Sequence, residues 1–205
     1  MKSLETSARA KLVAVDTVTL DYLDGRPLAT RFGPERIIDT PISEANIMGA
    51  AVGMALAGLK PVVEMRVIDF ALCGMDELVN QAAKNRYMFG GQGRVPLVVR
   101  MPIGIWTASA AQHSQSLETW LTHIPGLKVV YASNPIDAKG LLLSAIDDPD
   151  PVVVMESMML LYTQKDEVPT GDYRVPLGTP LSFVLDWAGA PDTEARQVIL
   201  GGPMM

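Results

Sequence analysis

The segment IDTPISEANIMGAAVGMALAGLKPVVEM (residues 38–65) joins the end of one predicted strand, a predicted helix and the start of the next strand. The helix follows Pro41 and ends near Gly58, since proline favours the first helical turn and glycine the position after the last. Apart from Glu44, this helix consists almost wholly of small and apolar residues. A carboxylate therefore heads a helix that offers it no obvious partner.

Two interpretations of Glu44 stay open on these residues alone. An acid in the first helical turn interacts favourably with the helix dipole, by about 0.3–1 kcal/mol at an exposed site. The functional alternative is a buried carboxyl group that faces a ligand and holds a proton for it.

One face of the same helix carries almost no side chain. Gly49, Gly53 and Ala57 recur every four residues, which lets a second helix approach closely. Further small residues on the helix are Ala45, Ala50 and Ala51. The second helix could belong to the same domain or to another subunit.

From residue 36 onward, short apolar runs alternate with helical patterns, as in βα units that build a largely parallel sheet. The predicted strands are residues 36–39, 61–67, 95–101, 127–133 and 151–156. The helices predicted after the first are residues 75–88, 116–123 and 134–146. The last has Asn134 as its N-cap. We therefore expect an α/β fold with a largely parallel sheet flanked by helices.

The two ends of the chain differ from its middle. We expect an atypical N-terminal segment at residues 1–35, the α/β domain at 36–163, a linker at 164–180 and an atypical tail at 181–205. The linker is rich in Pro, Gly, Asp and Thr. The tail could supply one helix and one strand, which is too little for a second domain.

Composition excludes several classes of partner. The 205 residues are 48% hydrophobic and carry a net charge of -6, which repels a phosphate backbone, so we expect no nucleic acid. The sequence contains no run of about 18 or more apolar residues free of charge, so we expect no membrane span. Cys73 is the single cysteine and cannot form an internal disulfide, which favours a cytoplasmic location.

The segment 103–115 fits neither helical nor strand periodicity and follows a predicted strand. Such loops at the carboxyl end of a parallel sheet commonly bind ligands. His113 lies in this loop among small neighbours that leave its ring unshielded, so it is the candidate for proton transfer. For His123, late in a short helix, we expect a structural role, and neither histidine has a second ligand at metal-site spacing.

Several catalytic motifs are absent. The sequence has no Walker loop, no dinucleotide glycine fingerprint, no G-x-S-x-G elbow and no H-E-x-x-H. GGQGR at residues 90–94 precedes a predicted strand and reads as a turn. Hydrolase and nicotinamide-dependent functions are therefore disfavoured.

Four stretches carry a family resemblance: the segment from FGPER to VVEM (32–65), MDELVNQAAKNRYMFGGQ (75–92), AAQHSQSLETWLTHIPGLKVV (110–130) and DAKGLLLSAIDDPDPVVVME (137–156). They resemble the beta subunit of thiamine-diphosphate-dependent 2-oxo acid dehydrogenases, the group that includes pyruvate, branched-chain 2-oxo acid and acetoin dehydrogenases. The resemblance implies a transketolase-type pyrimidine-binding domain.

The resemblance also implies roles for single residues. Glu44 is implied to be catalytic, because the family's glutamate hydrogen-bonds a ring nitrogen of the aminopyrimidine of thiamine diphosphate and activates the cofactor. Ile42 and Phe70 match residues that contact the same ring. His113 matches the histidine that assists acyl transfer to the lipoyl group of a partner acyltransferase.

A potassium ion and further partners are likewise implied. The family's ion would be held mostly by backbone carbonyls, at Leu97, Ala145, Ile146, Asp148 and Asp150.

Since the chain has no GDG motif, Mg²⁺ and the diphosphate would be held by an alpha subunit, and a beta–beta contact is expected as well. That alpha subunit also largely determines which 2-oxo acid is used. The location would be the mitochondrial matrix in a eukaryote.

The chain departs from the family at both ends. Residues 12–30 lack the family's acidic GEDV motif, and the C-terminal transketolase domain is missing from the sequence. The tail instead resembles part of the C subunit of a membrane-associated electron-transport complex. A second hypothesis is therefore a non-catalytic remnant or interaction domain of the same fold. A third is a carrier of electron-transport contacts through residues 179–205.

Overall fold

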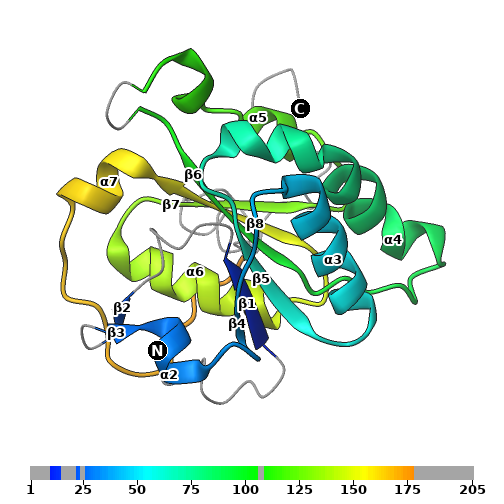
Figure 1. The fold of residues 1–205 in the computed structure, drawn as a ribbon, viewed down its shortest axis with the longest axis horizontal. Coiled ribbons are helices and arrows are strands. Elements are labelled where there is room, and N and C mark those ends of the chain that lie inside the picture. The colour runs from blue at the N-terminus through cyan, green and yellow to red at the C-terminus, as the bar shows by residue number, and fades with distance from the viewer. Residues whose placement is uncertain (1–9, 15–21, 24–25, 106–108, 178–205) are drawn as a thin grey trace, which may run out of the picture.

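The computed structural model describes residues 10–14, 22–23, 26–105 and 109–177. A six-stranded sheet lies between helices on its two faces (Figure 1). The strand order is β4-β1-β5-β6-β8-β7, and every neighbouring pair is parallel. The predicted α/β fold with a parallel sheet is confirmed.

All five predicted strands are present in the sheet, and a sixth joins them. The six are β1 (Ala10–Ala14), β4 (Ile37–Asp39), β5 (Lys60–Glu64), β6 (Val98–Ile103), β7 (Lys128–Ala132) and β8 (Val152–Ser157). Strand β1 was not predicted and inserts between β4 and β5. A separate antiparallel pair consists of β2 (Tyr22–Leu23) and β3 (Arg26–Pro27).

Each of the four predicted helices has a helical counterpart in the structure, and further helical segments join them. The α-helices are α2 (Leu28–Phe32), α3 (Glu44–Leu56), α4 (Ala83–Met88), α5 (Glu118–Thr122), α6 (Pro135–Asp147) and α7 (Met158–Thr163). The 3₁₀ segments η2 (Ile68–Gly74) and η4 (Ala111–His113) and the helices α2 and α7 were not predicted. The helix predicted at 75–88 contains a π-helical turn, η3 (Glu77–Ala82), before α4.

Two local predictions hold in detail. The side-chain oxygen of Asn134 accepts a hydrogen bond from the backbone N–H of Asp137 at 2.8 Å, which caps α6 as expected. Gly90 and Gly91 have positive φ and follow the end of α4. The strand predicted at 61–67 ends earlier, at Glu64.

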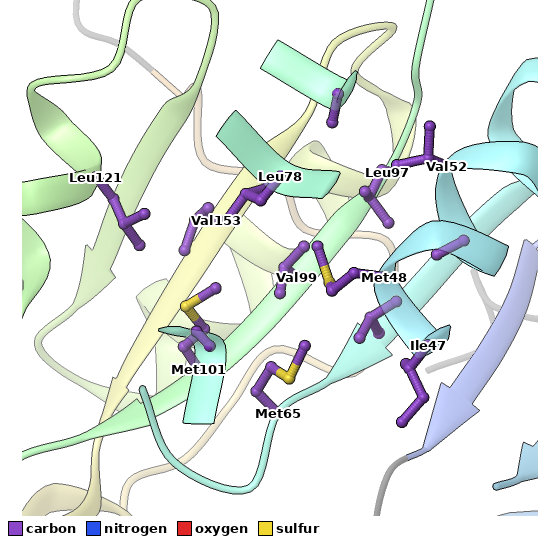
Figure 2. Close-up of a cluster of buried hydrophobic side chains, with 14 of the residues drawn as sticks. Ile47, Met48, Val52, Met65, Leu78, Leu97, Val99, Met101, Leu121 and Val153 are labelled. Atoms are coloured by element: carbon purple, nitrogen blue, oxygen red, sulfur yellow. The ribbon is translucent and has the colours of Figure 1, made fainter. Parts of the chain in front are cut away.

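The larger core lies between the sheet and the layer formed by α3, η2, η3 and α5. Figure 2 shows Met48 of α3 and Leu78 of η3 in the same buried cluster as Val99 of β6 and Val153 of β8. Strands β6 and β8 are buried along almost their whole length, as their continuous apolar runs predict for strands covered on both faces. The first turn of α3 is thereby fixed over the sheet.

Helix α6 covers the opposite face. Leu141 and Ile146 pack with Val98, Val152 and Val154 in a second buried cluster.

The segment before residue 178, expected as a linker, has no helix or strand after α7 and lies along α6. There Arg174 donates a hydrogen bond to the carbonyl of Leu143 at 2.7 Å. The expected tail lies outside the described residues, as does about half of the expected N-terminal segment.

The small-residue face of α3 is open. Gly53 and Ala57 are exposed, and a Cβ placed on Gly53 would meet nothing within 4 Å. A Cβ on Gly49 would lie 3.6 Å from Cγ of Glu77. Packing within the described part of the domain therefore reaches Gly49 and leaves Gly53 and Ala57 uncovered.

Candidate functional site

The residues expected to bind and activate a cofactor follow three strands of the sheet. Glu44 comes after β4, Phe70 after β5 and His113 after β6. Because these strands are parallel, their carboxyl ends meet at one edge, where α/β folds commonly bind ligands. The topology thus gathers three separate sequence positions along one edge of the sheet.

Glu44 is the first residue of α3 and is half-buried. Ser43 forms no side-chain cap, and its carbonyl accepts a hydrogen bond from the N–H of Ile47 at 2.9 Å. A Cβ on Gly74 would lie 2.9 Å from Cγ of Met48 and 3.2 Å from the Glu44 carbonyl oxygen. Glycine at 74 therefore lets η2, which carries Phe70, lie directly against the first turn of α3.

The rings of Phe70 and His113 meet edge to face. Their centroids are 5.1 Å apart and their planes are inclined by 86°, a geometry that aromatic pairs prefer. The expectation that small neighbours leave His113 unshielded is wrong, since Phe70 from another segment covers part of it. The Nδ1 atom of His113 is buried and has no hydrogen-bond partner among the described residues.

A hydrogen bond beside these rings was not predicted. Gln115 donates from Nε2 to Oδ1 of buried Asp69 at 2.7 Å. The sequence signal was a single acid within the apolar run VIDFAL (67–72), where a carboxylate needs a partner. Nothing local identifies Gln115 as that partner.

The site is open on one side. Ile42 is 79% exposed, and Ile105 at the start of the His113 loop is also exposed. Three cavities described in this structure lie elsewhere, and none of the three is lined by Glu44, Phe70 or His113. One is a cavity of about 270 Å³ between α6 and α7, lined in part by Asn134 and Glu156.

The five residues expected around a potassium ion lie at the opposite edge of the sheet. Leu97 precedes β6, and the remaining four lie in the last turn of α6 and in the loop before β8: Ala145, Ile146, Asp148 and Asp150. The carbonyls of Leu97 and Ala145 accept hydrogen bonds from Val152 N at 2.9 Å and Asp148 N at 3.2 Å. Each carbonyl oxygen retains a second lone pair.

Both carboxylates of this set pair with cationic side chains of the same chain. Lys128 contacts the two carboxylate oxygens of Asp148 at 2.8 and 2.6 Å, and Arg86 donates to Asp150 at 2.5 Å. A monovalent cation here would therefore depend on backbone carbonyls, the ligand type that the family resemblance implies.

Two negative observations apply to the described residues. They contain no group of three or more His, Cys, Asp or Glu side chains placed to hold a metal ion. None of their helices has the length and apolar character needed to cross a membrane. Hydrogen bonds from Asn80 and Gln81 hold the pKa of the Asp76 carboxyl below its ordinary value.

Fold and site together define a parallel α/β domain with an acid, two aromatic rings and an aliphatic side chain at its carboxyl edge. Residues 13–164 match the family described as "Transketolase, pyrimidine binding domain". The chain belongs to this family.

Curated relatives share the same region. The "Acetoin:2,6-dichlorophenolindophenol oxidoreductase subunit beta" of Bacillus subtilis is 52% identical over 151 residues, which are 74% of this chain and 44% of the relative. The "Pyruvate dehydrogenase E1 component subunit beta" of Rhizobium meliloti is 47% identical over 74% of this chain and 33% of its own length. The human mitochondrial protein of the same name is 42% identical over 86% of this chain and 51% of its own.

The chain spans about half or less of the length of these relatives. A solved structure titled "Split gene transketolase, inactive beta4 tetramer" superimposes with a TM-score of 0.64 at 17% identity. The superposition covers 85% of this chain and 52% of that one. At this identity the likeness shows a shared fold.

Proposed function

We propose that this chain serves as the beta subunit of a thiamine-diphosphate-dependent 2-oxo acid dehydrogenase, with Glu44 and His113 as its catalytic residues. The observation that carries the proposal is the gathering of Glu44, Phe70 and His113 at the carboxyl edge of the sheet. Family membership and the names of the relatives support it.

The residue types at this edge fit the aminopyrimidine half of the cofactor. A flat heterocycle suits contact with the ring of Phe70 and the aliphatic side chain of Ile42. The carboxyl group of Glu44 can exchange a hydrogen bond or a proton with a ring nitrogen. When bound, the cofactor supplies the nucleophilic carbon and the electron sink needed for decarboxylation.

The chain's own residues would then divide the work. Glu44 holds and returns a proton at its carboxyl oxygen, and the close approach of Gly74 fixes the helical turn on which it stands. His113 moves a proton during acyl transfer to a lipoyl group, with its ring oriented by Phe70.

The open side of the site favours a second chain that completes it. We assign this role to an alpha subunit that holds Mg²⁺ and the diphosphate, in line with the exposure of Ile42. A second beta subunit would cover the exposed face of α3 at Gly53 and Ala57. The lipoyl-bearing acyltransferase would approach His113. The complex would lie in the bacterial cytoplasm or the mitochondrial matrix.

A potassium ion at the amino edge would tie α6 to β6 and β8 through carbonyls, including those of Leu97 and Ala145. Bound K⁺ would raise the free energy of unfolding by about 1.4 kcal/mol at roughly ten times its dissociation constant. Equal unfolding midpoints in potassium chloride and tetramethylammonium chloride at the same ionic strength would count against the ion.

Calorimetric titration with thiamine diphosphate and Mg²⁺ tests the shared site. We expect binding heat from the co-expressed alpha–beta complex, less from the alpha subunit alone and none from this chain alone. The Phe70→Ala complex should bind more weakly than the wild type. Absence of heat in the assembled complex would contradict the proposal and favour a non-catalytic domain.

A further inference from the structure

A side-chain hydrogen bond joins the segment that carries Phe70 to the segment that carries His113. Gln115 donates from Nε2 to Asp69 Oδ1 at 2.7 Å, between residues 46 positions apart in the chain. Asp69 is 7% exposed, so the bond forms largely out of water. Because a buried carboxylate is costly without a hydrogen-bond donor, Gln115 stabilises Asp69 in this position.

The ring contact runs between the same two segments. Asp69 directly precedes Phe70, and Gln115 follows His113 by two positions. The Phe70 and His113 rings, 5.1 Å apart between centroids, form the second link. Together, the hydrogen bond and the ring contact define both the distance between the two segments and their relative rotation. A single contact would leave the segments free to rotate about it.

Regular secondary structure contributes little to the position of His113. Its segment contains the three-residue turn η4, and Ala110 before that turn has φ +75°, an uncommon conformation for a residue with a side chain. A backbone hydrogen bond from Gly104 N to Gln115 O at 3.0 Å holds the base of the loop. The orientation of the imidazole ring therefore depends on side-chain contacts.

We propose that Asp69 and Gln115 are positioning residues, whose hydrogen bond holds the His113 imidazole against Phe70 for acyl transfer. The catalytic consequence rests on the proposed function. The positioning itself is a property of this chain and is measured without cofactor or partner.

Three single variants and one double variant separate positioning from general damage. Gln115→Glu keeps the side-chain shape but sets a carboxylate against the Asp69 carboxylate, and Gln115→Met removes the donor without adding charge. Asp69→Asn keeps an acceptor for Gln115. The double variant Asp69→Asn/Gln115→Glu restores the bond with its direction reversed, since the asparagine amide donates to the new carboxylate.

The two histidines of the chain make its imidazole groups direct NMR probes. His123→Gln assigns the signals of the full-length, histidine-labelled chain, and Phe70→Leu gives the displacement that the Phe70 ring causes in the His113 signal. We expect Gln115→Glu and Gln115→Met to lose most of this displacement, and the double variant to recover it. The His123 signal should stay in place throughout.

The catalytic readout is acyl transfer to a lipoyl group by the alpha–beta complex. A displacement of about 1 Å can cost up to about 100-fold in rate, so we expect Gln115→Glu to lower acyl transfer by about tenfold or more and the double variant to restore it. An unchanged His113 signal in both Gln115 variants overturns the positioning proposal, as does a double variant that fails to recover the signal. A shifted signal with unchanged acyl transfer supports positioning and contradicts the proposed role of His113.

Discussion

Arg100 of β6 holds the carboxylate of Glu156 of β8 through two parallel hydrogen bonds. Nε lies 2.9 Å from Oε1 and Nη2 lies 3.0 Å from Oε2. A third bond, from Nη1 at 3.0 Å, reaches Glu64 of β5. Both carboxylates are buried and stand near the carboxyl ends of their strands. The guanidinium group therefore ties together the strand ends from which the Phe70 and His113 segments depart.

Arg100→Met should be strongly destabilising, because it leaves Glu64 and Glu156 buried without this cation. We expect the free energy of unfolding to fall by about 3–5 kcal/mol, measured by denaturant unfolding followed by circular dichroism. Lys60→Met is the matched control, since its ion pair with Asp147 is exposed and should contribute at most about 1 kcal/mol. Similar losses for the two variants would refute the importance of the buried network.

His113→Gln should separate two half-reactions of the complex. Acyl transfer to a lipoyl group should fall by about 100-fold or more, as expected when a general acid–base group is lost. Reduction of 2,6-dichlorophenolindophenol, the acceptor in the name of the Bacillus subtilis relative, should continue because it bypasses the lipoyl group. His123→Gln serves as control. Equal losses in both reactions would assign His113 to an earlier step.

Gly53→Ala and Gly53→Leu should affect the single chain and the assembly differently. Alanine in an exposed helix interior stabilises the isolated chain by about 0.5–1 kcal/mol relative to glycine. The bulk of leucine should leave the chain folded but weaken beta–beta association, which analytical ultracentrifugation measures. Unchanged association of Gly53→Leu would show that this face of α3 is not the contact.

Apolar runs were sufficient to predict β5, β6, β7 and β8, because buried parallel strands are hydrophobic on both faces. Strand β1 (AKLVA) was not predicted, although it equals β7 (KVVYA) in length and in lysine content. Its place between β4 and β5 depends on pairing with both neighbours, which no local pattern encodes. The early end of β5 also depends on contacts that are distant in the sequence. After Glu64 the chain leads into η2, and the packing of η2 against α3 requires glycine at position 74.

For the proposed site, the sequence resemblance implied roles for Glu44, Phe70 and His113, and the parallel topology accounts for their shared edge. The Asp69–Gln115 bond could not be predicted, because it links two polar residues far apart in the chain. The shielding of His113 by Phe70 is likewise a tertiary contact. Local patterns describe each segment, whereas the distance between segments follows from the sheet order.

The most direct measurement is dichlorophenolindophenol reduction by the alpha–beta complex carrying Glu44→Gln, which keeps the shape of the side chain and removes its acid. We predict a rate at least about 100-fold lower, with assembly and binding of thiamine diphosphate retained. Glu35→Gln, the same change at an exposed position, should leave the rate unaltered. A Glu44→Gln complex that turns over as fast as the wild type would contradict the account.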